Sequence, residues 1–325
     1  MNEFDLIVAL CASLPSNPGV IAGAGDDCAV LDSGRPGRAL LFKTDAVVEG
    51  VHFLPSATPE SIGHKALARP LSDIAAMAGR PLAALVTLAL PRNFDPEFIQ
   101  RIYAGMSLLA RRHGVAIVGG ETTSNPERLL ISVSLLGEVA RDKCMLRSGA
   151  GDGDALFVTG ELGGSLAGKH LQFEPRLEEA RWLAEHFPIH AMIDLSDGLA
   201  GDLRHLMARG KVGAELLVRA IPISRPARRH AAMADAAPGL RPEPKAPAKT
   251  PLLAALTDGE DYELLFAVAA RDAVPLSDAW RKQFPKLRLT CIGKITSAPG
   301  LTLRDASGVR PLEARGYTHF SPSLP

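Results

Sequence analysis

The sequence lacks the features that mark disulfide-stabilised, membrane-spanning and strongly charged proteins. Its four cysteines, Cys11, Cys28, Cys144 and Cys291, lie far apart and include no C-x-x-C pair, which is typical of a reducing compartment. Lysine plus arginine equals aspartate plus glutamate at 36 each, so no net field favours nucleic acid or an anionic membrane. The longest largely apolar run, residues 82–90, is about half of a membrane span. The first residues are acidic where a signal peptide is basic. We therefore expect a cytoplasmic protein without nucleic-acid or membrane partners.

The remaining composition is that of an ordinary globular protein. Of its 325 residues, 46% are hydrophobic and 22% are charged, and the length suits two domains with separate cores. The order of elements predicts a mixed α/β fold in two halves, residues 1–140 and 141–325. Residues 224–251 are rich in proline, alanine and arginine without a clear period, which predicts a mobile surface excursion.

Hydrophobic periodicity predicts the main elements. Helices are expected over residues 5–14, 61–78 and 96–112, with Pro70 marking a break in the second. Strands are expected over residues 39–45, 82–90, 115–120, 129–136, 155–159, 264–268 and 289–293, with a further strand starting at Ala191. A glycine-rich turn and a helix should follow the strand at residues 155–159.

Short acidic segments recur along the chain, and nearly every one adjoins an apolar stretch. Carboxylates resist burial unless they are paired, so acids at the ends of buried strands predict a cation between them. Oxygen ligands without a His/Cys cluster favour Mg²⁺, which usually works with phosphates. We interpret the chain as a phosphoryl-transfer enzyme that binds several metal ions. The segments are Gly25-Asp-Asp27, Thr44-Asp45, Ser72-Asp73, Gly119-Gly-Glu-Thr122, Asp194-Leu-Ser-Asp-Gly198, Asp202 and Asp258-Gly-Glu-Asp261.

Each segment taken alone has a simpler interpretation. The pair Asp26 and Asp27 is compatible with a solvated turn. Ser72 or Asp73 is compatible with a helix N-cap, and so is Ser196. A cap needs only one acceptor, however, and acids flank Ser196 on both sides. Repetition of the same arrangement along the chain favours metal binding over capping.

One glycine-rich segment nearly matches a nucleotide-binding P-loop. Residues 163–169 follow a predicted strand and end in Lys169, but position 170 is histidine where the motif requires serine or threonine for Mg²⁺. We interpret this segment as a closely packed helix start and reject a Walker-type fold.

Taken together, the segments resemble the thiamine-monophosphate kinase family, in the same order along nearly the whole chain. This family belongs to the aminoimidazole-ribonucleotide-synthetase-like ATP-binding superfamily. The resemblance implies two α/β domains, pairing of the N-terminal domains into a homodimer, and a cleft that binds ATP and several Mg²⁺ ions. The motifs that carry it are Gly23-Ala-Gly-Asp-Asp27, Thr44-Asp-Ala-Val-Val-Glu-Gly-Val-His-Phe53, Leu71-Ser-Asp-Ile-Ala-Ala-Met77, Gly119-Gly-Glu-Thr-Thr123, Leu146-Arg-Ser-Gly-Ala150, Ile193-Asp-Leu-Ser-Asp-Gly-Leu199, Gly259-Glu-Asp-Tyr-Glu-Leu-Leu-Phe266 and Gly316-Tyr-Thr-His-Phe320.

The resemblance also implies roles for individual residues. The metal-holding positions would be Asp27, Thr44, Asp45, Asp73, Glu121, Asp194 and Asp197. ATP would contact Tyr103, Gly120, Glu121, Arg147 and Ser196. Thiamine monophosphate would face His52, Glu260 and Tyr317. The acceptor is a phosphate monoester that is largely dianionic at neutral pH, with a second pKa of about 6, so no side chain is expected to act as a catalytic base.

Three positions depart from the family pattern. Lys43 stands where serine or threonine is usual, Glu121 replaces aspartate, and Asp258 replaces glycine. Lys43 and Glu121 leave the number of metal ions open from sequence. Two other interpretations remain: another ATP-dependent enzyme of the superfamily, or a nucleotide-binding scaffold without turnover. A selenophosphate synthetase would carry a reactive N-terminal cysteine beside a lysine, which Cys11 in its apolar surroundings does not resemble.

Overall fold

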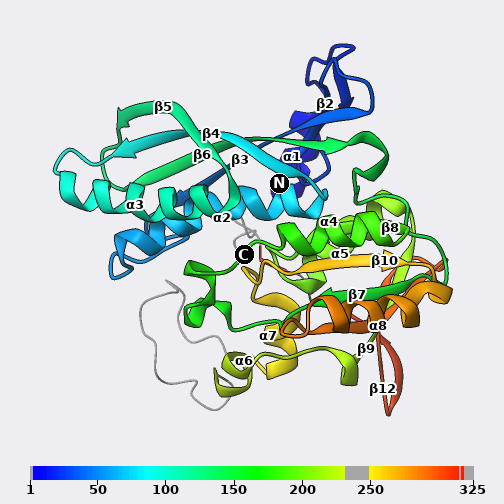
Figure 1. Cartoon of the computed structure of the whole chain (residues 1–325). Coiled ribbons are helices and arrows are strands. Elements are labelled where there is room, and N and C mark those ends of the chain that lie inside the picture. Colours follow the sequence, from blue (N-terminus) through cyan, green and yellow to red (C-terminus); the bar gives the residue numbers. More distant parts are fainter. Residues whose placement is uncertain (1–2, 231–248, 315, 318–325) are drawn as a thin grey trace.

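Two β-sheets organise the chain in the computed structural model, which describes residues 3–230, 249–314 and 316–317 (Figure 1). The six-stranded sheet has the order β1-β2-β3-β6-β4-β5, with β4 and β5 parallel and the other neighbours antiparallel. The elements of this N-terminal unit are α1 (Glu3–Cys11), β1 (Val20–Ala22), β2 (Ala29–Asp32), β3 (Arg38–Val48), α2 (Pro59–Ala76), β4 (Arg80–Leu90), α3 (Pro96–His113), β5 (Ala116–Ser124) and β6 (Leu130–Ala140).

The second sheet has seven strands in the order β13-β12-β9-β11-β7-β10-β8. Its elements are β7 (Ala155–Thr159), α4 (Leu177–His186), β8 (Ile189–Asp194), α5 (Leu199–Gly210), β9 (Gly213–Leu217), α6 (Arg225–His230), α7 (Pro251–Thr257), β10 (Leu264–Val268), α8 (Ala273–Gln283), β11 (Leu289–Thr296), β12 (Leu301–Asp305) and β13 (Gly308–Pro311). Single 3₁₀ turns add η1 (Arg141–Lys143), η2 (Ser165–Ala167), η3 (Lys169–Leu171), η4 (Val218–Ala220) and η5 (Ala270–Asp272).

The N-terminal sheet is buried on one face and open on the other. Alternate residues of a strand point to opposite faces, and in β3 Leu41 and Val47 are fully buried. Figure 1 shows α2 and α3 lying along this inner face. On the outer face, Phe42 is 47% exposed, Leu85 48% and Val118 63%, so a row of apolar side chains remains in contact with solvent.

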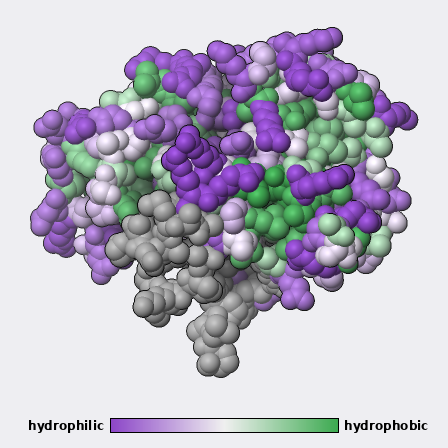
Figure 2. Space-filling view, turned by 90° about the horizontal axis from the view of Figure 1, so that it is seen from below, coloured by the Kyte–Doolittle hydropathy of each residue, from purple (hydrophilic) through white to green (hydrophobic). Residues whose placement is uncertain are grey.

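Both faces of the neighbouring strands β7 and β10 in the C-terminal sheet are covered, which explains their apolar sequences. In β10, Leu264 and Phe266 join a core that includes α4, α8 and also α2 of the N-terminal unit. Leu265 and Ala267 point the other way, into a second core with α5 and α7. Figure 2 views the molecule from below, where hydrophilic side chains dominate the rim and hydrophobic ones gather right of centre. No helix within the described ranges is long and apolar enough to cross a membrane.

Helix α2 lies between the two units and is buried along almost its entire length. Its N-terminus is capped by Thr58, whose side-chain oxygen accepts from the Ser61 amide, and Pro59 occupies the first turn. The predicted break at Pro70 is wrong, because α2 continues through this residue to Ala76. Packing on all sides, by fully buried residues such as Leu67 and Leu71, outweighs the hydrogen bond that proline removes.

Two other predictions about elements also need correction. The glycine-rich segment after β7 forms two 3₁₀ turns instead of starting an α-helix, because Gly164 and Gly168 adopt positive φ values of 70° and 134°. The excursion predicted over residues 224–251 is wrong at its ends, which form α6 and the start of α7. Residues 231–248 lie outside the described part of the chain.

The contact between α2 and α3 generates a stability prediction. A Cβ atom on Gly63 would lie 1.9 Å from the Ile102 carbonyl oxygen, so only glycine permits this separation of the helices. We expect Gly63→Ala to lower the free energy of unfolding by about 1–3 kcal/mol through overpacking. Thermal denaturation measures this, with Gly151→Ala as the matched control, since a Cβ there meets its nearest atom at 3.8 Å. Equal melting temperatures for the two variants would contradict this packing.

Candidate functional site

Three buried aspartates from both units meet at one place. Asp27 precedes β2, Asp73 lies in α2, and Asp194 ends β8 of the C-terminal sheet. One carboxylate oxygen from each lies within 4.8 Å of the others, and a set of oxygen ligands with this spacing fits a divalent cation. These three predicted metal positions are therefore adjacent in the fold, although they are far apart in sequence.

Each carboxylate of this cluster has a fixed polar partner. Arg147 donates to Asp27 at 2.8 Å, and its backbone amide donates to Asp26 at 2.7 Å. The Ser72 hydroxyl donates to Asp194 at 2.6 Å, and the Lys43 ammonium lies 2.7 Å from Asp73. Neither the solvated-turn nor the capping interpretation fits, since Asp27 is buried and Asp73 lies in the interior of α2.

Burial and mutual repulsion act against ionisation of these acids. Burial raises the pKa of Asp194 to about 7, and the charge of Asp27 adds to the shift. Burial also raises the pKa of Asp73 and that of Asp202 well above their ordinary values. A bound divalent cation would reverse this effect by favouring the ionised forms. The site is thus electrostatically prepared for a cation.

Asp45 lies beside this cluster on the inner face of β3. Its carboxylate is 4.0 Å from the Lys43 ammonium and 3.7 Å from the Arg69 guanidinium. Arg69 also donates to the carbonyl oxygen of Ala46 at 2.9 Å, which fixes the guanidinium at the border between α2 and β3. Asp45 is therefore on the same side of the sheet as Asp73.

The loop after β8 connects the aspartates to the remaining predicted residues. The Asp197 amide donates to Asp202 at 3.1 Å, and the carbonyl of Asp197 accepts from the Tyr317 amide at 2.8 Å. The Ser196 carbonyl accepts from the Glu260 amide at 2.6 Å. Helix α5 is preceded by Gly198 without a side-chain cap bond, so Ser196 is not the N-cap.

Two of the predicted substrate-facing residues meet at a buried lysine. The fully buried Lys65 ammonium donates to the His52 carbonyl oxygen at 2.6 Å and also to the Glu260 carboxylate. Burial lowers the pKa of Lys65 to about 8. Glu260 has a φ of 55°, a left-handed conformation that is uncommon for residues other than glycine and typical of functional sites.

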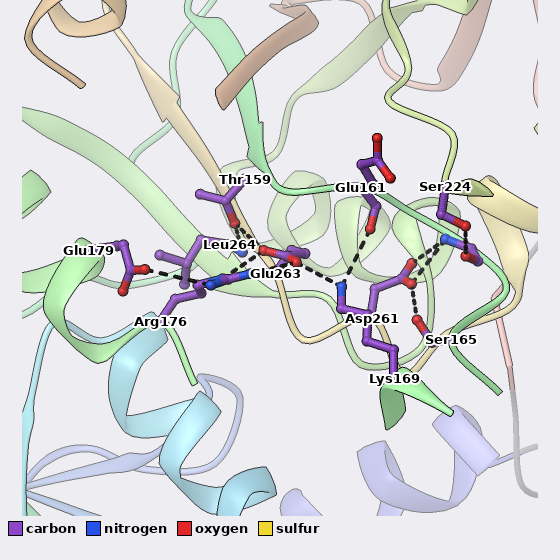
Figure 3. A network of polar contacts seen from close by, with 11 residues as sticks. Thr159, Glu161, Ser165, Lys169, Arg176, Glu179, Ser224, Asp261, Glu263 and Leu264 are labelled. Atoms are coloured by element: carbon purple, nitrogen blue, oxygen red, sulfur yellow. Dashed lines mark hydrogen bonds and ion pairs between the residues drawn. The ribbon is translucent and has the colours of Figure 1, made fainter. Parts of the chain in front are cut away.

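A polar network of the residues that follow Glu260 fixes the loop in which it lies (Figure 3). The Asp261 carboxylate accepts from the Gly163 amide at 2.9 Å and also from the Ser165 hydroxyl. Glu263 is buried between the Lys169 ammonium at 2.7 Å and the Arg176 guanidinium at 2.8 Å. Lys169 is thus paired inside the protein, in contrast to the phosphate-binding lysine of a P-loop.

Four predicted residues lie away from the aspartate cluster. Thr44 occupies the outer face of β3, where its hydroxyl is 3.2 Å from that of Ser134. Glu121 is exposed on the edge strand β5, aligned with Thr87 of β4. Gly120 neighbours it there, and Tyr103 lies on α3. Because β6 and β4 separate β3 from β5, the strands that carry Thr44 and Glu121 are roughly 14 Å apart, at about 4.8 Å per strand spacing.

Sequence reasoning missed two cations of the site, Lys65 and Arg69. Together with Asp73 they occupy positions i, i+4 and i+8 of α2, which places all three on one side of the helix. Three ionisable residues at this spacing, inside a helix whose other residues are mostly apolar or small, are the signal that would have identified them.

The raised pKa of Asp194 generates a prediction about metal affinity. Burying the charged form of Asp194 destabilises the fold. This destabilisation is absent below the ordinary pKa of 3.8, where the group is protonated in both states, and is complete above about pH 7. A proton competes with a cation below pH 7, so we expect apparent Mg²⁺ affinity to fall about tenfold from pH 8 to pH 6. Calorimetric titration at the two pH values measures this, and a pH-independent affinity would contradict the assignment. Asp194→Asn should bind weakly at both values.

Comparison with known proteins matches both units of the chain to one family. Residues 25–139 match the AIR synthase related protein N-terminal domain, and residues 148–305 match the C-terminal domain. A thiamine-monophosphate kinase of Rhodopirellula baltica is 40% identical over 93% of this chain and 92% of that protein. One of Bacillus subtilis is 33% identical over 98% and 100% of the two chains.

Solved structures give the same result. One described as AaThiL complexed with AMPPCP and TMP has a TM-score of 0.80 and 30% identity, covering 98% of this chain and 97% of that chain. The thiamine-monophosphate kinase of Stenotrophomonas maltophilia has a TM-score of 0.71 and 32% identity, covering 93% and 96%. The chain described here therefore belongs to the thiamine-monophosphate kinase family of AIR synthase related proteins.

Proposed function

We propose that this protein transfers the terminal phosphoryl group of ATP to thiamine monophosphate, with Mg²⁺, and so produces thiamine diphosphate. The observation that carries the proposal is the meeting of Asp27, Asp73 and Asp194 between the two units, beside Lys65 and Glu260. Relatives named for this activity cover nearly the whole chain, and a structural neighbour is described with an ATP analogue and TMP bound.

The acceptor needs little activation from the protein. With a second pKa of about 6, a phosphate monoester is already largely a dianion at neutral pH, so no catalytic base is required. The main obstacle is repulsion between this dianion and the triphosphate. Asp27, Asp73 and Asp194 would hold Mg²⁺, which when bound would supply positive charge that lowers this repulsion and stabilises the leaving oxygen. The residues of the chain contribute position and a fixed electrostatic field.

The described contacts support separate roles for the two sides of the site. Asp27, Asp73 and Asp194 hold metal, with Asp45 and Asp197 beside them. Arg147 and Ser196, at the same junction, are placed to contact the nucleotide. This assignment keeps nucleotide and metal together where the two units meet.

The substrate side begins one turn along α2 from Arg69. Lys65 joins His52 to Glu260, and the Glu260 carboxylate suits the cationic thiazolium ring of thiamine. Tyr317, anchored to Asp197 through its backbone amide, offers an aromatic ring for stacking. Acceptor and metal thus approach each other along the loop of residues 194–198.

We further propose that the protein is a homodimer paired through the outer face of the N-terminal sheet. Phe42, Leu85 and Val118 leave apolar surface there that a second copy would cover. Thr44 and Glu121 lie too far apart within one chain to share an ion, whereas pairing of two sheets can bring one β3 close to the other β5. Gly120 adjoins Glu121 on β5 and would then serve the neighbouring site, whereas Tyr103 lies on α3, which packs against the other face of the sheet.

The proposal includes the domain boundary at residue 140 and a cytoplasmic location. The last strand of the N-terminal sheet along the chain, β6, ends at Ala140. The following strand, β7, starts at Ala155 and belongs to the other sheet, which supports the boundary. The four cysteines are all free in the structure, which agrees with a reducing compartment.

Activity is tested with purified protein, ATP, Mg²⁺ and thiamine monophosphate, with thiamine diphosphate measured by chromatography. Asp45→Asn and Asp197→Asn should each lower kcat on the order of 100-fold or more, because charge stabilisation is lost. Asp278→Asn, on the exposed surface of α8, is the matched control. Absence of product from the unmodified protein would favour a nucleotide-binding scaffold, and full activity of either site variant would overturn the assignment of that residue.

The dimer proposal predicts that a charge on the outer face separates the subunits. Leu85→Asp should elute as a monomer in size-exclusion chromatography with light scattering, because a buried carboxylate at the interface is costly. Val274→Asp, at an apolar position of α8 that is 70% exposed, should leave the dimer intact. A monomeric unmodified protein, or a dimeric Leu85→Asp variant, would refute this interface.

A further inference from the structure

The Lys43 side chain lies inside the acidic cluster, in which the candidate metal ligands are carboxylates. The Lys43 ammonium is 2.7 Å from one oxygen of Asp73 and 4.0 Å from an oxygen of Asp45. Its side chain is 23% exposed, so it is largely enclosed by the groups around it. Lys43 therefore provides a fixed positive charge on the side of the cluster where Asp45 and Asp73 face each other.

The backbone keeps this charge in place. Lys43 lies within the central strand β3, which pairs with β2 through residues 39–42 and with β6 through residues 38–48. Alternation in β3 directs Lys43 and Asp45 to the same inner face, toward α2. Lys43 itself pairs with Leu135 of β6, and the pairing with β2 ends at the preceding residue, so its backbone is held in the sheet and displacement of the ammonium must come mainly from the side chain.

The polar partners of the carboxylates divide the cluster into two parts. Asp27 and Asp194 face Arg147 and the Ser72 hydroxyl from one side. Asp45 and Asp73 face Lys43 from the other. A divalent ion bound between Asp45 and Asp73 would have to share their oxygens with the ammonium, and the two positive charges would repel each other at short range.

We propose that Lys43 acts as a built-in monovalent cation that takes the place of one divalent ion between Asp45 and Asp73. The metal site formed by Asp27, Asp73 and Asp194 then holds its ion on the side away from Lys43. This inference rests on the proposed function for the presence of metal in the cluster. It adds that the chain binds one divalent ion fewer than it would with an oxygen ligand at position 43.

The number of ions is measured with Mn²⁺ alone and with Mn²⁺ plus a non-hydrolysable ATP analogue, by electron paramagnetic resonance of the full-length protein. Lys43→Ser removes the charge and supplies a hydroxyl, so it should bind one more Mn²⁺ per chain than the unmodified protein. Lys43→Arg retains the charge and should bind the same number. Lys282→Ser, exposed on α8, is the matched control and should not change the count.

Equal counts for the unmodified protein and Lys43→Ser would overturn the inference. If Lys43→Ser does not fold, crystals of the unmodified protein soaked in Mn²⁺ decide the question by anomalous scattering. A manganese peak bridging Asp45 and Asp73 overturns the inference, and a peak confined to Asp27, Asp73 and Asp194 supports it. Mn²⁺ binding without formation of thiamine diphosphate would refute the kinase activity alone, whereas absence of any bound Mn²⁺ would refute both proposals.

Discussion

The repulsion among carboxylates at the junction of the two units is the constraint on which the rest of the site depends. Asp27 and Asp73 belong to one unit and Asp194 to the other, so closing the junction brings like charges together in a place with little water. Such a contact is unfavourable unless cations compensate it. The protein supplies part of that compensation itself, through Arg147 and Lys43. The residual negative charge supports the proposal that metal and nucleotide bind at this junction.

Helix α2 connects the aspartate cluster to the cores of both units. It packs on the N-terminal sheet, and its buried residues belong to the same core as those of α4 and β10. A helix in such a position is expected to be apolar on every side, yet α2 contains Lys65, Arg69 and Asp73. These residues are tolerated because each one meets a partner from another element. The same contacts hold the two units in a fixed relation, so the polar groups of the site also determine domain geometry.

Much of this site was predictable from the sequence because many of its residues belong to short local patterns. Acids at the ends of apolar strands, such as Asp194 at the end of β8, identify the junction before any fold is known. The two-residue period of a strand also separates Thr44 from Asp45, since neighbours in β3 must point to opposite faces. The resemblance treated both residues as ligands of one site, and only the pairing of β3 with β6 shows which face each occupies. Lys65 escaped prediction because its partners, the carbonyl of His52 and the carboxylate of Glu260, come from distant segments.

The spacing along α2 explains how one rigid element can serve both ends of the reaction. Lys65, Arg69 and Asp73 follow one another at intervals of four residues, roughly 6 Å each along the helix axis. Lys65 pairs with Glu260 on the proposed substrate side, Asp73 belongs to the aspartate cluster, and Arg69 lies between them near Asp45. A row of phosphate groups extending from acceptor to donor would thus run beside two fixed positive charges, Lys65 and Arg69, and then the carboxylate of Asp73. Because the helix is buried, these distances cannot relax when charge shifts from the donor to the acceptor, and positioning of this kind is the protein's main contribution to phosphoryl transfer.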